Sequence, residues 1–443
     1  MDLPFLPRFW QDLLASMACF LHQRHAWRLA VLLLGALFAN GRRTVTRWLR
    51  AAHVSRGFAA YYYFLAALGR HADFLAGLLL RQALDRLAPE GPLLLAIDDS
   101  PTPRYGPHVQ GAGLHHNPTP GPTGQKFLYG HVWVCLAWIV LHPLWGALGL
   151  PLLARLYVRR KDVPRLPPRA GWSFHTKLEL AADLVTWAAR WARTAGKAVR
   201  VVVDGFYAKR PFLKAVAAAE VTVVSRLRRD ARLHTVPVPP RGRRRRGRPP
   251  LYGPGRISLA KRAGNPRGWQ TVPARQYGHI RSKRTKTFLA TWRPAGGCIR
   301  VVIVREEHGW LALFSTEPSL AVAEILSLAA DRFALEQDFH DLKEVEGLGQ
   351  QQVRNIWANV GAFQVSAWVH TLVELWAWGQ PREVIGDRSA SPWDDPERRP
   401  SHADRRKALQ RLCLQREFQG LAEGQALTPE IQQFVGRVID HAA

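Results

Sequence analysis

Three acidic segments, far apart along the chain, carry the residue types that bind divalent metal ions. Asp98 and Asp99 follow the apolar run Leu93–Ile97, and Asp204 follows the apolar run Val199–Val203. Such short apolar runs are typical of buried strands, so each predicts a carboxylate where a strand ends at the edge of a sheet. Carboxylates that converge repel each other unless a cation lies between them. Hard oxygen ligands with open positions suit Mg²⁺ or Mn²⁺.

The third acid lies in a segment with helical periodicity. Arg332, Glu336, His340 and Lys343 are spaced by 4, 4 and 3 residues, which puts them on one helical face. In isolation this pattern is typical of a solvated face with ion pairs. Beside two other acidic segments in a basic chain, it favours one metal ligand, Glu336, flanked by cations for phosphate. The set predicts a phosphoryl-transfer site in which two ions, ~3.5–4 Å apart, clamp the attacking and leaving oxygens.

The composition points to a polyanionic partner. The 443 residues include 62 Lys and Arg against 34 Asp and Glu, a formal charge of +28. Nucleic acid is the first candidate and an anionic membrane surface the second. The 47% of hydrophobic residues exclude a disordered chain. The four cysteines lie far apart without a Cys-x-x-Cys pair, which argues against a disulfide scaffold or a paired-cysteine zinc finger and favours reduced thiols in the cytoplasm.

One apolar stretch, residues 131–158, is long enough to span a membrane. His142, Pro143 and Pro151 interrupt it, and Val, Ile and Trp crowd its first half. Two buried strands joined by a turn at 142–144 fit better. We therefore expect no membrane partner.

The elements that would position the acids fall into three regions. Residues 1–90 show helical periodicity, and Thr44 is a candidate N-cap of a helix that carries Arg47 and Arg50. This segment is equally consistent with a helix-turn-helix-like DNA reader and with a helical cap on the next domain. Residues 91–380 read as an α/β catalytic domain with a basic, strand-rich insertion at about 228–315. Residues 381–443 form a basic helical tail.

The strand motifs resemble those of a known family. The segments LLAIDDSPTPR (94–104) and VVVDG (201–205) resemble the first-Asp and second-Asp strands of DDE transposases of the IS4-type group, closest to the IS701-like branch. The 132 positions from Asp204 to Glu336 leave room for the β-rich insertion of that group. An Asp-x-Ser/Thr pattern selects Asp98 as the first acid, whereas a hydroxyl directly after the acid selects Asp99. We prefer Asp98 and keep both.

The helical segment resembles the same family. Arg332-x3-Glu336-x6-Lys343 matches the signature Tyr-x2-Arg-x3-Glu-x6-Lys of this group. The signature's Tyr falls at Ala329, so any role of that Tyr is absent or supplied elsewhere.

The resemblance implies an RNase H-like catalytic core with a β-rich insertion and helical N- and C-terminal regions. It implies Mg²⁺-dependent (or Mn²⁺-dependent) cleavage at transposon ends and strand transfer into target DNA. The metal ligands, for two ions, would be Asp98 or Asp99, Asp204 and Glu336, while Arg332 and Lys343 hold phosphate. The partners would be terminal-repeat and target DNA, with a homodimer on DNA in the prokaryotic cytoplasm, associated with the nucleoid. The alternatives are an inactive transposase-derived DNA-binding protein and an RNase H-like nuclease that does not transpose.

Weaker signals complete the set of expectations. Arg246-Gly247-Arg248-Pro249 is the core of a minor-groove hook, although nonspecific phosphate contact is the preferred role of this Arg-rich loop. Trp292 and Trp310 could stack on a flipped base, but core packing is preferred for both. The remaining acids of the helical segment are expected at the surface, with Asp338 as the nearest substitute for Glu336; these acids are Asp338, Asp341, Glu344 and Glu346.

Overall fold

A computed structural model describes residues 3–117, 124–238, 249–386, 393–395 and 397–421, with single positions between 428 and 438. Within these residues one 12-stranded sheet runs through the molecule in the order β2-β3-β1-β5-β6-β12-β11-β10-β7-β8, with β4 paired to β3 and β9 to β10. The strands are β1 (Leu93–Pro103), β2 (Gly113–His116), β3 (Phe127–His142), β4 (Gly146–Tyr157), β5 (Val199–Val203), β6 (Thr222–Leu227), β7 (Leu233–His234), β8 (Arg256–Ile257), β9 (Gln270–Gln276), β10 (His279–Trp292), β11 (Gly297–Glu306) and β12 (Gly309–Ser315).

Five neighbouring strands, β4-β3-β1-β5-β6, form the core of this sheet. β3 runs antiparallel to both β4 and β1, whereas β5 runs parallel to both β1 and β6. This order and these directions are those of an RNase H-like core. The predicted α/β fold class is confirmed, and so is the pair of strands joined by a turn, because β3 ends at His142 and β4 begins at Gly146.

The basic strand-rich segment extends the core sheet. β12 pairs antiparallel with β6, and β11, β10 and β7 follow in turn. The inward face of this extension is apolar: Trp292 is 7% exposed and packs on Phe314 at 5.1 Å between ring centroids. Core packing is therefore the role of Trp292 here. Trp310 is half-buried under the guanidinium of Arg229.

Helices cover both faces of the core sheet. The helices are α1 (Arg8–Ala18), α2 (Gln23–Phe38), α3 (Val45–Ala51), α4 (Phe58–Leu87), α5 (Lys177–Thr194), α6 (Arg210–Ala218), α7 (Leu259–Gly264), α8 (Val322–Asp331), α9 (Phe333–Glu344), α10 (Ile356–Ala377), α11 (Arg382–Ile385) and α12 (His402–Leu421). Inward residues of α5 and α6 join one apolar core with Leu95 and Val201. On the opposite face, Leu335 and Phe339 of α9 pack with Ala96. The result is a three-layer arrangement.

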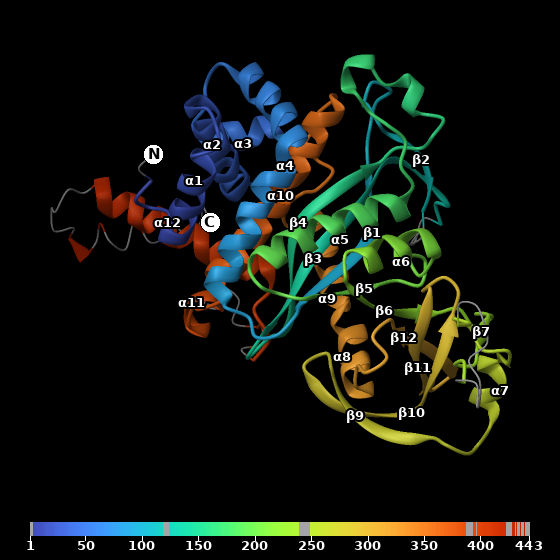
Figure 1. Ribbon diagram of the computed structural model, residues 1–443. Helices are drawn as coiled ribbons and strands as arrows, with labels where there is room; N and C mark the ends of the chain where they lie inside the picture. Colours follow the sequence, from blue (N-terminus) through green and yellow to red (C-terminus); the bar gives the residue numbers. More distant parts are fainter. Residues whose placement is uncertain are drawn as a thin grey trace.

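The N-terminal helices gather around α10 and α12 at one end of the molecule, and strands β9–β12 lie at the other end (Figure 1). The indole nitrogen of Trp10 donates to the Leu372 carbonyl of α10 at 3.3 Å. Thr44 caps α3 by accepting from the backbone N–H of Arg47, as predicted. α4 alone among the described helices has the length and apolarity of a membrane span, yet 56% of the relevant window is buried against its neighbours.

The first acidic segment differs from expectation in one respect. β1 does not end before Asp98 but continues to Pro103, so Asp98 and Asp99 lie within the strand and pair with Cys135 and Val134 of β3. The apolar run marks only the first half of β1, although Ser100 and Thr102 of the second half are buried too. The strand continues because β3 is long enough to supply backbone partners beyond it, which the local pattern of β1 does not reveal.

Candidate active site

A groove of about 770 Å³ opens where the second half of β1 meets α9. Its lining residues include Arg42, Asp98, Asp99, Glu336, Lys343 and Gly349. Thus residues from three distant segments share one surface. Arg42 belongs to the loop before α3, which is held against the C-terminal end of α9 by a bond from the Arg43 backbone N–H to Gln350 Oε1 of 2.9 Å.

Asp98 and Glu336 are joined by one guanidinium. Arg332 Nη1 donates to Asp98 Oδ2 at 2.9 Å, and Arg332 Nη2 donates to Glu336 Oε1 at 2.6 Å. Arg332 lies at the junction of α8 and α9, in helical conformation. The first and third acidic segments, 238 positions apart between Asp98 and Glu336, therefore meet in the fold.

Asp99 makes different contacts. Its Oδ2 accepts from Lys177 Nζ at 2.6 Å and its Oδ1 from the Tyr207 hydroxyl at 3.0 Å. Successive side chains of a strand point to opposite faces, so Asp99 is directed toward α5 while Asp98 is directed toward α9. Both residues border the groove, but only the carboxylate of Asp98 shares a partner with Glu336.

Asp204 directly follows β5, as the sequence predicts. In the parallel pairing of β1 and β5, Ile97 lies opposite Val203, which brings Asp98 and Asp204 to neighbouring positions. Asp204 Oδ2 accepts from the backbone N–H of Phe206 at 3.1 Å, and the residue is exposed. It is not among the residues that line the groove. Asp98 and Glu336 line the groove, and Asp204 lies beside Asp98 outside this lining; we call the three together the groove acids.

The electrostatics of Asp98 reflect this crowding. The pKa of Asp98 is raised to about 6, mainly by burial; the Arg332 guanidinium opposes the rise, and the negative charges of Asp99 and Asp204 add to it. A carboxyl that is harder to ionise because other carboxylates lie near is one whose ionised form a cation would stabilise. Burial also raises the pKa of the Tyr207 hydroxyl, so Tyr207 stays a neutral donor to Asp99.

The donor set fits a hard divalent ion. The groove acids present carboxylate oxygens only, the ligands that Mg²⁺ and Mn²⁺ prefer. The Arg332 guanidinium, which is itself a cation, already lies between two of these acids, Asp98 and Glu336. Asp98, Asp204 and Glu336 could therefore hold a metal at the groove.

The sequence-predicted phosphate ligands are placed unequally. Arg332 borders the acids, and Lys343, in the last turn of α9, lines the groove. Arg246 and Arg248 lie outside the described residues. Sequence reasoning did not select Lys177, the first residue of α5. The capping box of Thr176 and Glu179 marks the start of this helix and was the available signal for its position. Sequence reasoning also missed Tyr207, three positions after Asp204.

The surface expectation for the other acids of the predicted helical segment is wrong for three of the four, and one of these, Glu346, lies beyond the end of α9. Asp338, Asp341 and Glu346 are buried, and only Glu344 is exposed. Asp338 lies so close to β4 that a Cβ at Gly149 would come within 1.7 Å of its Oδ2. This carboxylate is directed away from the groove, because α9 is covered by β4 and α12 on the side opposite Glu336.

A family comparison bears on these residues. Residues 16–294, more than half of the chain, match the family model described as DDE superfamily endonuclease. The match includes Asp98, Asp99 and Asp204 and ends before Glu336. No curated protein matches the chain. With an RNase H-like core and acids at its central strands, the chain belongs to the DDE superfamily endonuclease family.

Proposed function

We propose that this endonuclease is a DNA transposase, which cleaves the ends of its own element and joins them to target DNA. The observation that carries the proposal is the shared contact of Asp98 and Glu336 with Arg332, beside Asp204 on the neighbouring strand. Two of these carboxylates line one groove and the third follows the neighbouring strand, and carboxylates gathered from separate segments are what two-ion phosphoryl transfer requires.

Each residue has a role in this proposal. Asp98, Asp204 and Glu336 hold divalent ions, Mg²⁺ or Mn²⁺, which when bound activate water or a 3′-hydroxyl and stabilise the leaving oxygen. Asp99 keeps Lys177 and Tyr207 in place on the far side of β1. Lys343 and Arg42 face the groove and supply positive charge for the DNA backbone.

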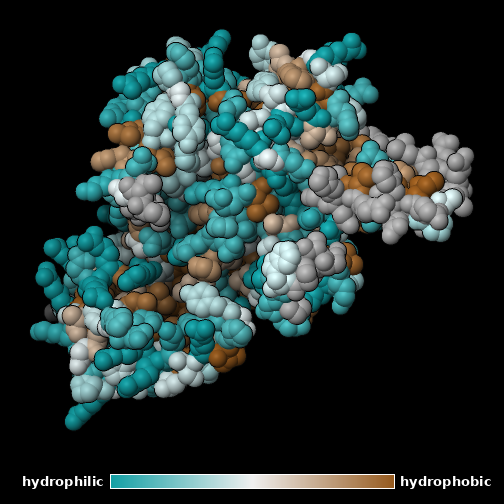
Figure 2. All heavy atoms as spheres, turned by 180° about the vertical axis from the view of Figure 1, so that it is seen from behind, coloured by the Kyte–Doolittle hydropathy of each residue, from teal (hydrophilic) through white to brown (hydrophobic). Residues whose placement is uncertain are grey.

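The charge of the chain supports DNA as the partner. With a formal charge of +28, the surface attracts phosphate, and one face of the molecule is covered mainly by hydrophilic side chains (Figure 2). In the proposal, residues 1–90 contact DNA next to the groove, residues 91–380 carry out the chemistry, and the tail 381–443 adds basic contacts. Such binding weakens steeply as salt rises.

The finer assignment rests on α9. The spacing of Arg332, Glu336 and Lys343 favours the IS4-type group and its IS701-like branch. A homodimer on DNA, which brings two transposon ends together, and a prokaryotic cytoplasmic location associated with the nucleoid complete the proposal.

The test uses the full chain with linear DNA carrying the element's terminal repeats and Mg²⁺. We expect cleavage at the repeat ends and joined products with target DNA. Asp204→Asn and Glu336→Gln should each abolish both while DNA binding persists, with Glu307→Gln, at an exposed turn outside the groove, as the control. Binding without any cleavage by the wild type would indicate an inactive descendant, and cleavage without joining an RNase H-like nuclease; either result contradicts the proposal.

A further inference from the structure

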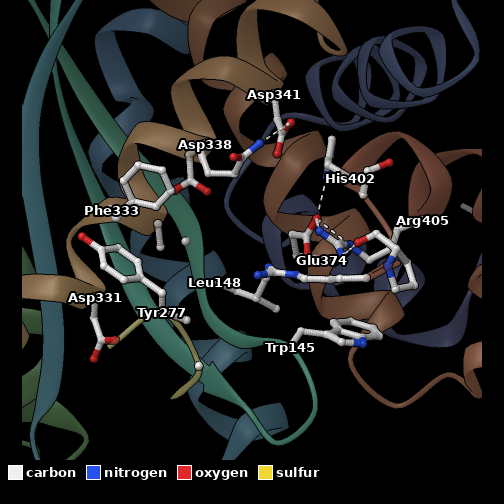
Figure 3. Close-up of a pocket in the computed structure, with 18 of the residues that line it drawn as sticks. Trp145, Leu148, Tyr277, Asp331, Phe333, Asp338, Asp341, Glu374, His402 and Arg405 are labelled. Atoms are coloured by element: carbon white, nitrogen blue, oxygen red, sulfur yellow. Dashed lines mark hydrogen bonds and ion pairs between the residues drawn. The ribbon is translucent and has the colours of Figure 1, made fainter. Parts of the chain in front are cut away.

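A second group of ionisable side chains lies beneath α12, on the side of α9 away from the groove. His370 and Glu374 lie one turn apart on α10, and His402 is the first residue of α12. Their exposures are 2%, 1% and 1%. We call these three residues the buried histidine cluster. Figure 3 shows Glu374 and His402 directed toward one another beside Arg405.

Part of this cluster is already paired. His402 Nδ1 lies 2.6 Å from Glu374 Oε1, and His402 Nε2 lies 3.0 Å from Oε1 of Glu346. Arg405 Nε donates to the same Glu374 Oε1 at 2.9 Å. These contacts join α12 to α10 and to the end of α9.

The rest of the cluster is unpaired. Neither ring nitrogen of His370 has a hydrogen-bond partner among the described residues, and the same holds for Glu374 Oε2. The His370 ring stacks on His402 at 4.0 Å between centroids, which brings its nitrogens next to those of His402. A buried polar atom without a partner is unfavourable, and three at one place indicate an occupant that would satisfy them.

We infer that the buried histidine cluster binds one divalent transition-metal ion of the zinc class, through His370, Glu374 and His402. One ligand atom from each residue lies within 4.8 Å of the others. Tetrahedral zinc with bonds of about 2.0–2.1 Å needs ligand atoms about 3.3 Å apart, a contraction that side-chain rotation supplies. Two imidazoles and a carboxylate suit zinc rather than Mg²⁺.

The surroundings fit such an ion. Glu346 pairs with His402 Nε2, as a carboxylate does behind many metal-binding histidines, and the metal would replace the proton that joins His402 Nδ1 to Glu374 Oε1. Arg405 occupies only one oxygen of Glu374 and leaves Oε2 for the metal. A cavity of about 290 Å³ borders the cluster and offers room for a water as fourth ligand. Asp338 and Asp341 line the same cavity and add negative charge.

The ion would fasten the C-terminal helix to the core. His402 belongs to α12, whereas His370 and Glu374 belong to α10, whose residues are almost all buried. The site is independent of the proposed transposition, because none of the groove acids lines its cavity.

The test measures zinc binding in the full chain carrying Asp204→Asn and Glu336→Gln, so that the groove acids do not contribute. After treatment with chelator, we expect ZnCl₂ to bind at one ion per chain in calorimetry and to raise Tm. His370→Phe keeps the ring stack and removes both nitrogens, so it should abolish this binding. Glu346→Gln should weaken it by ~10–100-fold. His308→Phe, at an exposed turn, is the matched control and should bind as before.

A second readout covers the case in which His370→Phe fails to fold. Co²⁺ is added to the chain that carries only Asp204→Asn and Glu336→Gln, with the buried histidine cluster intact. We expect the visible absorption of a four-coordinate Co²⁺ site with imidazole ligands, and ZnCl₂ should displace the Co²⁺ ion. Absence of this spectrum together with absence of stoichiometric zinc would overturn the inference and leave a hydrated ion-pair network. Zinc bound equally by folded His370→Phe would overturn it too.

Discussion

Two clusters of acids and cations, one beside α9 and one just after its C-terminal end, lie in opposite settings. In the first, Glu336 meets Asp98 through Arg332 in a wide groove, with side chains 45%, 24% and 22% exposed. In the second, Glu346 meets His402 and Arg406 with side chains at most 4% exposed. Both clusters join acids to cations, but only the first leaves room for a polymer.

Exposure decides what each cluster can do. In the groove, water and substrate reach the side chains. A metal ion can therefore replace the guanidinium as partner of the carboxylates, and phosphate can replace the carboxylates as partner of the guanidinium, at a modest cost in free energy. Beneath α12, each charge depends on its partners, because an unpaired buried charge is strongly unfavourable. We therefore expect substitutions in the groove to affect chemistry, and substitutions beneath α12 to affect stability.

The largest expected effect separates the two candidates for the first acid. Asp98→Asn should reduce Mg²⁺-dependent cleavage by at least ~10³-fold, because it removes a metal ligand worth several kcal/mol. Asp99→Asn keeps a side chain that can accept from Tyr207 and should stay within ~10-fold of wild type. Cleavage rates on terminal-repeat DNA measure both. The reverse ranking would assign the metal to the Lys177 side of β1.

The second effect concerns the buried cluster just after the C-terminal end of α9. Glu346→Ala leaves His402 and Arg406 without their shared carboxylate and should lower the free energy of unfolding by about 3–5 kcal/mol. Urea denaturation with chelator present measures this loss apart from any metal. Glu344→Ala, on an exposed residue two positions away, should change stability by less than ~0.5 kcal/mol. Equal losses would contradict the contrast between the two clusters.

Sequence reasoning succeeded where a local pattern determines the outcome. The apolar run 199–203 ends at Val203 in the structure as predicted, so the position of Asp204 could be read directly. The spacing of Arg332 and Glu336 placed both on one helical face, and their contact confirms that face.

It failed where the outcome depends on distant packing. Nothing near Asp338 or Glu346 indicates that β4 and α12 cover them, so both read as surface acids. His402 lies in a Pro- and Arg-rich tail, and its partners Glu346 and Glu374 precede it by 56 and 28 residues. Such a cluster exists only once α9, α10 and α12 have packed. The different partners of Asp98 and Asp99 likewise depend on the elements that pack on each face of β1.

A smaller effect sharpens the account of the groove. Arg332→Gln removes the cation between Asp98 and Glu336, so Ca²⁺, used as a probe without catalysis, should bind about tenfold more tightly. Calorimetry at pH 8 is the suitable measurement, because Asp98, with a pKa of about 6, is then ionised in the wild type. Arg200→Gln, which removes an arginine paired with Glu317 outside the groove, serves as control. Weaker Ca²⁺ binding would mean that Arg332 positions the acids instead of competing for them.

A pH-dependent effect contrasts a buried neutral histidine with the one beneath α12, which is charged when no metal is bound. His131 accepts from Arg104 Nε at Nδ1, and burial lowers its pKa to about 3, whereas two carboxylates raise the pKa of His402 to about 9. His131 takes up a proton more readily in the unfolded chain than in the folded protein. Its contribution to the free energy of unfolding is therefore present above pH 6.5 and is lost as the pH falls from 6.5 toward 3, by up to ~1.4 kcal/mol per pH unit. His131→Gln retains an acceptor without titrating. We expect urea denaturation between pH 7.5 and 5 to show that the free energy of unfolding falls less steeply with falling pH in this variant, with about one proton fewer taken up on unfolding. Parallel curves for the variant and the wild type would mean that His131 is not held neutral by the fold.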